Sequence, residues 1–381
     1  MTGSSRINAP LIGRPASRAA LNTPALVLDL SSFERNLASM AEAARRRGVQ
    51  LRPHAKTHKC CEIARRQIAA GAIGLSCAKL AEAEIFAQSG IGGLLLTSPV
   101  VTRQGIERLT ALARVAPDLM LVADDPENVR ALDEAAAAAG LCLRVLVDLD
   151  VGLHRTGVAS VGDGIALARM IARSPALTFA GLQGYAGHAM HIAGREARLA
   201  ALEASARQLR DLRDGLTRVG LPPAIVTGGG TGSFDLDPGF DVLTELQVGS
   251  YVFMDREYAE IWSDCRETPP FEAALFVQTT VISASHPGRC TTDAGCKAFA
   301  TEAGPPRIVA GAPDGAHYAF FGDEQGLVTF AEEQGRLAPG SVLTCLTPHC
   351  DPTVNLYDVL HVVRDDVLQD IWRIEARGCS Q

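Results

Sequence analysis

The stretch QLRPHAKTHK, residues 50–59, places His54, Lys56, His58 and Lys59 within six residues. These side chains could form a basic rim for an anion, hold a metal through the two histidines, or present one reactive lysine. A lysine amine has a pKa of about 10.4, and cationic neighbours lower it and favour the neutral amine that forms a Schiff base. Lys56 has such neighbours, with Arg52 before it, whereas a metal site would lack a nearby carboxylate. The residues alone leave all three interpretations open.

A second stretch, TGGGTGS at residues 227–233, is rich in glycine. Glycines let backbone N–H groups converge on an anion, and the hydroxyl groups of Thr231 and Ser233 could add donors. The spacing matches neither a P-loop nor a GxGxxG fingerprint. From this segment alone, a structural turn is as good an interpretation as a phosphate cradle.

Two further stretches carry polar side chains at the ends of apolar runs. DVGLHRTG, residues 150–157, contains Arg155, and GYAGHAMH, residues 184–191, contains Tyr185, His188 and His191. Later in the chain, TPHCDPTVN places His349 and Asp351 two residues apart, which on a strand would turn both side chains the same way. One imidazole and one carboxylate suit Mn²⁺ or Mg²⁺, although a lone HxD pattern is also common in loops.

These stretches follow short apolar segments that alternate with helical patterns rich in Ala, Leu and Arg. The segments read as eight strands: VQLRPHA, IGLSCA, GLLLTS, LMLVAD, LRVLVDLDV, TFAGLQGY, AIVTGG and TELQVGSYVF. Eightfold alternation predicts a (β/α)₈ barrel, whose functional residues gather at the C-terminal ends of the strands. A doubly wound open sheet is the alternative, but it usually has a glycine-rich first turn, and here the glycine-rich segment comes late.

The sequence pattern changes near residue 271, where long helical patterns give way to β-rich runs separated by Gly, Pro and Asp. We therefore expect an N-terminal arm at residues 1–22, a barrel at 23–270 and a β-rich domain at 271–381. The early strand at residues 25–30 is expected to join the β-rich domain. Ser31 or Ser32 is expected to cap a helix that runs to about Arg47, and the arm is expected to be loose.

The overall composition is that of an ordinary globular protein. The 381 residues carry a net charge of −7, which argues against a nucleic-acid partner. The 10 cysteines form no CxxC pair and suggest reduced thiols. The N-terminus does not have the pattern of a secretory signal, and no apolar run reaches the roughly 18 residues of a membrane span. We therefore expect a cytoplasmic protein without a membrane partner.

Six ordered motifs together resemble the D-threonine aldolase and 3-hydroxy-D-aspartate aldolase family, which is related to the D-serine dehydratases. The motifs are RPHAKTHK, DVGLHRTGV, GLQGYAGH, TGGGTGS, ELQVGSYVFMD and PHCDPTVNLYD. The resemblance spans about residues 23–378 and implies an alanine racemase-like fold: a barrel that binds pyridoxal phosphate plus a β-domain, usually in a dimer. The same resemblance places Lys56 on the family's Schiff-base lysine.

The resemblance also implies roles for individual residues. Arg155 and Tyr185 would lie against the cofactor ring, and Tyr251 would approach its pyridine nitrogen. His191 matches a histidine near the substrate hydroxyl. The residues that would hold the phosphate are Gly230, Thr231, Gly249 and Ser250. Two positions depart from the pattern: Ala78 replaces a common glutamine and Ala186 replaces a common histidine.

The activity implied is cleavage of D-3-hydroxy amino acids to glycine and an aldehyde, with pyridoxal phosphate and a divalent metal, Mn²⁺ or Mg²⁺. His349 and Asp351 would hold the metal, because aldolase members read His-x-Asp where dehydratase members tend to read His-x-Cys. A dehydratase that yields a 2-oxo acid and ammonia is the first alternative, and a non-catalytic pyridoxal-phosphate carrier is an alternative of another class. The resemblance further implies a homodimer in which the β-domain of one subunit completes the other's site.

Overall fold

The computed structural model describes residues 7–264, 270–334 and 336–381. The chain forms two compact units. The barrel unit comprises Met40–Lys56, Ile63–Gly249 and Gly378–Gln381, and the β unit comprises Met1–Ser39, Thr57–Glu62 and Ser250–Arg377.

The barrel unit contains eight parallel strands in the order β2-β9-β8-β7-β6-β5-β4-β3. An isolated parallel bridge between His54 and Ser76 joins the two strands at the ends of this order. The predicted barrel architecture is thus confirmed, with each expected segment contributing one strand. The strands are β2 (Gln50–Leu51), β3 (Leu75–Cys77), β4 (Leu94–Leu96), β5 (Met120–Ala123), β6 (Leu143–Asp148), β7 (Leu177–Gly184), β8 (Ile225–Gly228) and β9 (Glu245–Leu246).

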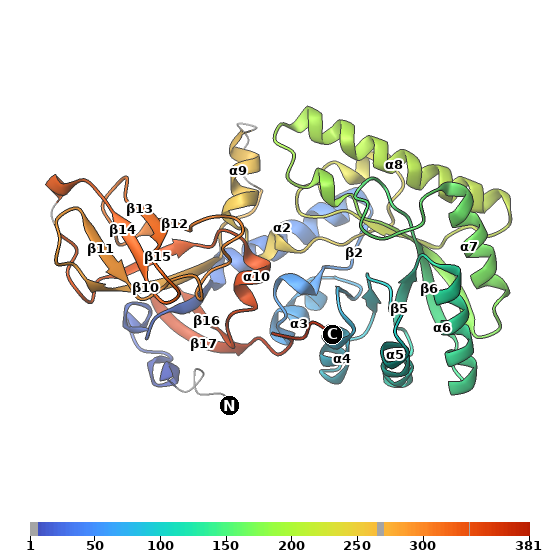
Figure 1. Cartoon of the computed structure of the whole chain (residues 1–381), viewed down its shortest axis with the longest axis horizontal. Helices are drawn as coiled ribbons and strands as arrows, with labels where there is room; N and C mark the ends of the chain where they lie inside the picture. The colour runs from blue at the N-terminus through green and yellow to red at the C-terminus, as the bar shows by residue number, and fades with distance from the viewer. Residues whose placement is uncertain (1–6, 265–269, 335) are drawn as a thin grey trace. The chain divides into compact units, whose positions relative to one another are not determined.

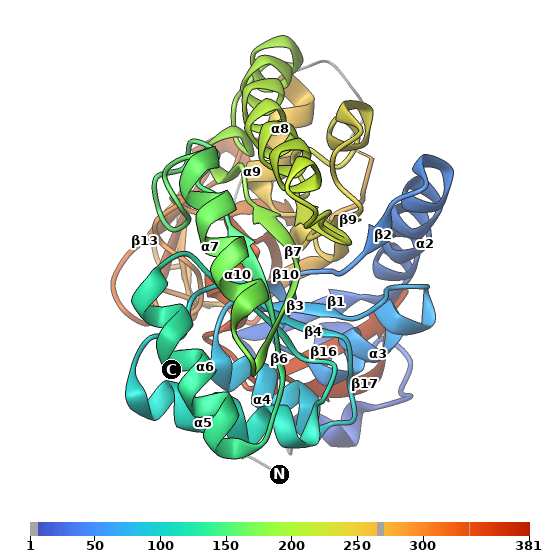
Figure 2. The ribbon, with the colours of Figure 1, turned by 90° about the vertical axis from the view of Figure 1, so that its right-hand side faces the viewer.

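Helices cover the outside of these strands, as Figure 2 shows for α5, α6 and α7. Polar side chains define where several helices begin: Thr102, Asp125 and Ser160 each accept a backbone N–H from the first turn. Apolar side chains from β4 to β7 form a core cluster that includes Leu95, Val122 and Leu146. The helices are α3 (Cys61–Ala69), α4 (Leu80–Gln88), α5 (Arg103–Val115), α6 (Pro126–Ala139), α7 (Val161–Arg173) and α8 (Arg195–Arg218).

The β unit is built on a nine-stranded sheet, drawn mainly in orange and red in Figure 1. Its main path runs β13-β14-β11-β10-β1-β16-β17, and β15 pairs with both β10 and β12. The predicted β-rich domain is confirmed, but β11 and β12 were not predicted. The strands are β1 (Ala25–Asp29), β10 (Leu275–Ser283), β11 (Arg289–Thr292), β12 (Arg307–Ala310), β13 (His317–Phe320), β14 (Gly326–Thr329), β15 (Val342–Leu346), β16 (Val359–Arg364) and β17 (Val367–Arg373).

The N-terminal segment packs against this sheet. Strand β1 pairs antiparallel with β10 and parallel with β16. The hydroxyl of Ser17 accepts the N–H of Leu368 at 2.7 Å, and Leu21 is buried in a cluster with Val27 and Val363. The expectation of a loose arm is therefore wrong for residues 7–22, because these residues bury apolar surface and share hydrogen bonds with the sheet.

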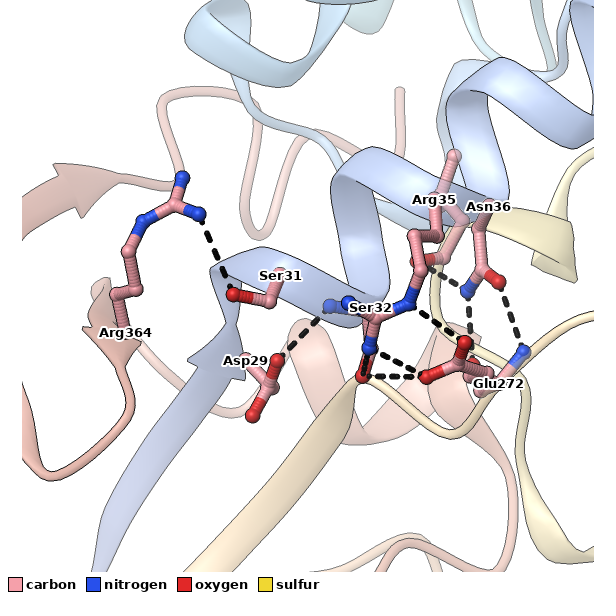
Figure 3. A network of polar contacts seen from close by, with 8 residues as sticks. Asp29, Ser31, Ser32, Arg35, Asn36, Glu272 and Arg364 are labelled. Atoms are coloured by element: carbon pink, nitrogen blue, oxygen red, sulfur yellow. Dashed lines mark hydrogen bonds and ion pairs between the residues drawn. The ribbon is translucent and has the colours of Figure 1, made fainter.

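A polar network fixes the start of helix α2 (Leu30–Arg47), as Figure 3 shows. The carboxylate of Asp29 accepts the N–H of Ser32 at 2.9 Å, so the cap is this aspartate and neither of the two predicted serines. Glu272 pairs with Arg35 at 2.6 Å and accepts a hydrogen bond from Ser32 at 3.0 Å. The Asn36 side chain exchanges two hydrogen bonds with the backbone of Glu272, at 2.7 and 2.8 Å. The first turn of α2 is thereby held to the segment that precedes β10.

Within the ranges that the structure describes, none of the helices combines the length and apolar character that a bilayer-spanning segment needs. The nine cysteines in those ranges are all unbridged.

Candidate active site

Lys56 lies in a short 3-10 helix, η3 (Ala55–Thr57), at the end of the first barrel strand. A continued strand would place Arg52, His54 and Lys56 on one face, but the chain turns out of extended geometry at the lysine. Regular pairing of β2 ends at Leu51, although the Arg52 N–H still bonds to the last residue of β9 and the His54 N–H to the segment that follows β9. The turn places the lysine at the C-terminal end of the strand, as predicted for a barrel site.

The basic residues near Lys56 are held in place by an ion pair and by hydrogen bonds. Arg52 is buried and forms a two-pronged ion pair with Glu245, at 2.8 and 3.0 Å. The charge of Arg52 is therefore paired with that of Glu245. His54 accepts the N–H of Lys56 on Nδ1 at 3.4 Å, and its Nε2 lies 3.2 Å from the Thr97 hydroxyl. Because that hydroxyl donates to the Cys77 carbonyl at 3.1 Å, we assign the imidazole proton to Nε2.

Arg155 and Tyr185, predicted to flank a cofactor ring, are brought together. The guanidinium carbon of Arg155 lies 5.5 Å from the centre of the Tyr185 ring, within the range of a cation–π contact. Tyr185 directly follows β7, and Arg155 lies in the loop after β6. That loop is shaped by Asp150, whose carboxylate accepts the N–H groups of Gly152 and His154, both at 2.9 Å.

The glycine loop, residues 227–233, begins in β8 and packs closely on its neighbours. A Cβ at Gly230 would lie 2.7 Å from Met190 Sδ, and one at Gly232 would lie 2.3 Å from Met190 O. The Gly230 N–H donates to the Ser233 hydroxyl at 3.1 Å, which gives this amide an acceptor inside the loop. Thr231 is only 1% exposed. Gly232 is therefore required for close packing against backbone, whatever the loop binds, whereas a side chain at Gly230 would need the Met190 side chain to move.

The remaining predicted residues follow the sixth and eighth barrel strands in the sequence. Gly249 lies three residues after β9, and Ser250 and Tyr251 begin the 3-10 helix η6 (Ser250–Val252) in place of the predicted strand. Both side chains are buried, and the Tyr251 ring lies 5.7 Å from that of Phe271. His191 is exposed and follows the 3-10 helix η4 (Gly187–Ala189).

A buried polar network at the strand ends was not predicted. The Gln183 amide donates to the Asp148 carboxylate at 2.9 Å and to the Thr97 carbonyl at 3.1 Å. Gln247 donates to the Gln183 side-chain oxygen at 3.2 Å and to the Thr227 hydroxyl at 3.0 Å. Burial raises the pKa of Asp148 to about 6, against hydrogen bonds that lower it. The network ties the ends of β4, β6, β7, β8 and β9 together beneath the rim.

In the β unit, His349 and Asp351 lie at the start of a helix, α10 (Cys350–Val354), and not on a strand. His349 is its N-cap residue, and Asp351 is in its first turn. The His349 Nδ1 lies 2.8 Å from Glu302, which directs the ring proton to Nδ1 and leaves Nε2 as the ligating nitrogen. The buried Asp255 fixes this start, because its carboxylate accepts the N–H of Cys350 at 3.0 Å.

This donor pair fits a hard divalent ion that keeps part of its water shell. Magnesium is commonly held by one or two protein carboxylates with water in the other positions, and a carboxylate that hydrogen-bonds a ligating histidine is a usual supporting feature. In the described ranges, no group of three or more His, Cys, Asp or Glu side chains is arranged to hold a metal. The pair His349 and Asp351 would therefore need water or substrate to complete the coordination.

Comparison with known proteins gives consistent matches over nearly the whole chain. Residues 28–257 match the family model described as "Alanine racemase, N-terminal domain", and residues 274–363 match a serine dehydratase domain model. The chain is 43% identical to a D-threonine aldolase from Arthrobacter sp over 97% of this chain and 96% of that protein. It is 35% identical to a 3-hydroxy-D-aspartate aldolase from Paracoccus denitrificans, over 94% of this chain and 92% of that protein.

Solved structures give the same picture of the fold. The crystal structure of D-threonine aldolase from Filomicrobium marinum matches with a TM-score of 0.90 and 38% identity, over 95% of this chain and 98% of that one. D-threo-3-hydroxyaspartate dehydratase from Delftia sp. matches with a TM-score of 0.84 and 26% identity, over 93% of this chain and 98% of that one.

Proposed function

Because the chain belongs to the family of D-threonine aldolase and 3-hydroxy-D-aspartate aldolase, we propose that this lyase uses pyridoxal phosphate and a divalent metal to cleave D-3-hydroxy amino acids to glycine and an aldehyde. The observation that carries the proposal is the 43% identity to a D-threonine aldolase over almost the full length of both proteins. Substrates of the D-threonine, D-phenylserine or 3-hydroxy-D-aspartate type fit this family.

The predicted donors suit pyridoxal phosphate. When bound, the cofactor supplies an electron sink that accepts the electron pair of the breaking Cα–Cβ bond. Lys56 would hold the cofactor covalently through its side-chain amine. Arg155 and Tyr185 would hold the ring, and Tyr251 its pyridine nitrogen. The phosphate would be held by Gly230, Thr231, Gly249 and Ser250.

His191 would remove the proton from the C3 hydroxyl of the substrate, directly or through water. A general base must come within hydrogen-bond reach of the proton that it removes. His191 is exposed after η4, so it would reach the hydroxyl proton once the substrate is bound. A divalent metal at His349 and Asp351 would supply positive charge that favours the ionised hydroxyl. Glu302 would hold His349 in the ligating tautomer.

A dehydratase is the second candidate function. It is favoured by 30% identity to a D-threo-3-hydroxyaspartate dehydratase from Delftia sp., over 85% of this chain and 81% of that protein. Asp351 distinguishes the two, because a carboxylate favours harder ions than the cysteine that dehydratase members tend to carry there.

Product analysis should decide between the two. Incubation with a panel of D- and L-3-hydroxy amino acids is expected to yield glycine and an aldehyde from the D-isomers, at a rate at least about 100-fold above that for the L-isomers. Glycine is quantified by chromatography, and ammonia by a coupled assay. Ammonia and 2-oxo acid as main products would instead establish the dehydratase. If neither product pair forms, the carrier alternative remains.

The protein is further proposed to act as a homodimer, in which the β unit of one subunit completes the site of the other. Lys56→Ala and His349→Ala protein, each inactive alone, should regain activity when mixed under conditions that exchange subunits. In an equal mixture, about half of the dimers are hybrids, and one of the two sites in each hybrid is intact. The mixture should therefore recover about a quarter of the activity of the same amount of wild type. Hybrids demonstrated by mass spectrometry but without activity would place both halves of the site in one chain.

A further inference from the structure

The acid Asp237, at the start of the 3-10 helix η5 (Asp237–Phe240), is buried beneath the glycine loop. It is 6% exposed and borders a cavity of about 20 Å³, which is room for one water molecule. A Cβ at Gly229, where φ is +71°, would lie 2.5 Å from its carboxyl oxygen Oδ2. The carboxyl group is thus packed directly against the loop backbone, and a larger residue than glycine would collide with it.

Hydrogen bonds connect Asp237 to the loop on the other side of Thr231. Its Oδ2 lies 2.5 Å from the Ser233 hydroxyl, and that hydroxyl accepts the Gly230 N–H at 3.1 Å. The Asp237 N–H also donates to the Ser233 carbonyl at 2.9 Å. Because these contacts reach Gly230 through Ser233, the carboxyl group helps to set the backbone on both sides of Thr231.

The surroundings of this carboxyl group are nearly free of charge. Helix α8 lines the cavity with uncharged side chains, of which Ser205 is the polar one, and β7 contributes Gly184. Asp235 is the charged neighbour that bears on Asp237, and it is paired with Arg195 of α8 at 2.5 Å. Arg210 of α8 donates to the Phe240 carbonyl at 3.0 Å. Burial, reinforced by Asp235, raises the pKa of Asp237 to about 7, against the Ser233 hydrogen bond that lowers it.

We propose that Asp237 is a positioning residue that, as the uncharged acid, holds the glycine loop in the shape that receives the cofactor phosphate, and that loss of its proton weakens cofactor binding. The inference rests on the proposed function, in which Thr231 holds that phosphate. An ionised carboxylate under the loop would repel the phosphate in a poorly screened environment. By linkage, a bound phosphate would in turn favour the protonated acid.

The test compares pyridoxal phosphate binding to wild type and to Asp237→Asn, using the full chain freed of cofactor. Asparagine has the shape of the protonated acid and can donate to Ser233, but it cannot ionise. If only the acid form binds and its pKa is about 7, the ratio of wild-type to variant Kd should rise about tenfold from pH 6 to pH 8. The ratio cancels titration of the cofactor itself, because both proteins bind the same compound.

Pyridoxal, which lacks the phosphate, is the matched control, and its ratio should stay constant over the same pH range. A constant ratio for pyridoxal phosphate, or an equal rise for pyridoxal, would overturn the inference. If pyridoxal phosphate binds neither protein, the proposed function fails as well, so the two failures are distinguishable.

A second measurement covers the case in which Asp237→Asn does not fold. Calorimetry of wild type at pH 8, in two buffers of different ionisation enthalpy, reports the protons taken up on binding. Pyridoxal phosphate should take up close to one proton more than pyridoxal, because most Asp237 is ionised at that pH before binding. No difference, or proton release, would contradict the proposed role.

Discussion

Protein in which Lys56 is replaced by alanine should be colourless and should cleave D-3-hydroxy amino acids at least about 1000-fold more slowly than the wild type. The wild type should be yellow, because the bond between the cofactor aldehyde and the lysine amine absorbs visible light. Borohydride reduces this bond and fixes the cofactor to the chain. Peptide mass mapping of the reduced wild type should then find the adduct on Lys56.

Few residues compete with Lys56 as the site of the adduct, because the sequence contains only four lysines: Lys56, Lys59, Lys79 and Lys297. Lys297 is exposed and pairs with Glu324 at 2.5 Å, and this hydrogen bond raises its pKa and keeps the amine protonated. Lys79 is exposed beside the start of α4. Lys59 is the near competitor, three residues from Lys56, but it has a positive φ of 52° and its carbonyl accepts the Ala376 N–H.

Lys59→Asn is the matched control, since asparagine tolerates a positive φ better than most residues. This variant should keep the yellow colour and the borohydride adduct. An adduct on Lys59 in the wild type, or loss of colour in Lys59→Asn but not in Lys56→Ala, would reverse the assignment.

The barrel could be predicted because its signal is local. Each strand is a short apolar run, and an α-helix follows each of them except β8, which is followed by the 3-10 helix η5. The conformation at Lys56 could not be read in the same way. Pro53 has no N–H to donate, and after Leu51 the regular pairing of β2 stops. The two-residue side-chain alternation of a strand, applied to the sequence, therefore extends the strand past the point where the chain turns.

The start of α10 was not predicted, because the sequence there was interpreted as a strand or a loop, although it contains a signal for a helix. Pro352 follows Asp351 in the first turn, where a helix tolerates proline and favours a carboxylate. The spacing of His349 and Asp351 would place both side chains on one face of a strand, but at the start of a helix it does not. The partner β14 of β11 and the partner β15 of β12 lie far along the chain, and strands of four residues leave little local signal.

The buried network around Gln183 illustrates what no local pattern contains. Gln183 lies in an apolar strand, and its partners Thr97, Asp148 and Gln247 come from three other parts of the barrel. Such a polar residue is tolerated inside only when its hydrogen bonds are satisfied, and this depends on register between strands. Asp237 is a similar case, because its burial under the glycine loop depends on the packing of α8 and η5.

The second large effect is expected at the metal pair. Asp351→Ala should lose cleavage activity by at least about 100-fold while keeping the yellow colour, because the metal acts on the substrate and not on cofactor attachment. Chelation of the wild type should have the same effect, and Mn²⁺ or Mg²⁺ should restore activity better than Zn²⁺. Metal content by mass spectrometry and cleavage of D-threonine or D-phenylserine are the measurements.

The variant Glu302→Gln tests whether His349 acts by binding a metal or by stabilising the fold. Glutamine can still accept a hydrogen bond from His349 Nδ1 but carries no charge, so the imidazole becomes a weaker ligand while the fold is kept. Metal affinity should fall about 10-fold, and excess Mn²⁺ should restore the rate. An undiminished rate in chelated wild type would rule out the metal role.

The same experiment separates the two candidate reactions, because they require different fates for the C3 oxygen. Aldol cleavage needs this oxygen to lose its proton and keep its bond to carbon, whereas dehydration needs it to leave as water. A carboxylate at Asp351 selects hard ions, and a thiolate at that position would select zinc. Asp351→Cys should therefore shift the metal preference toward Zn²⁺. If the metal-loaded wild type releases ammonia and 2-oxo acid as its main products, dehydration replaces cleavage as the activity of this protein.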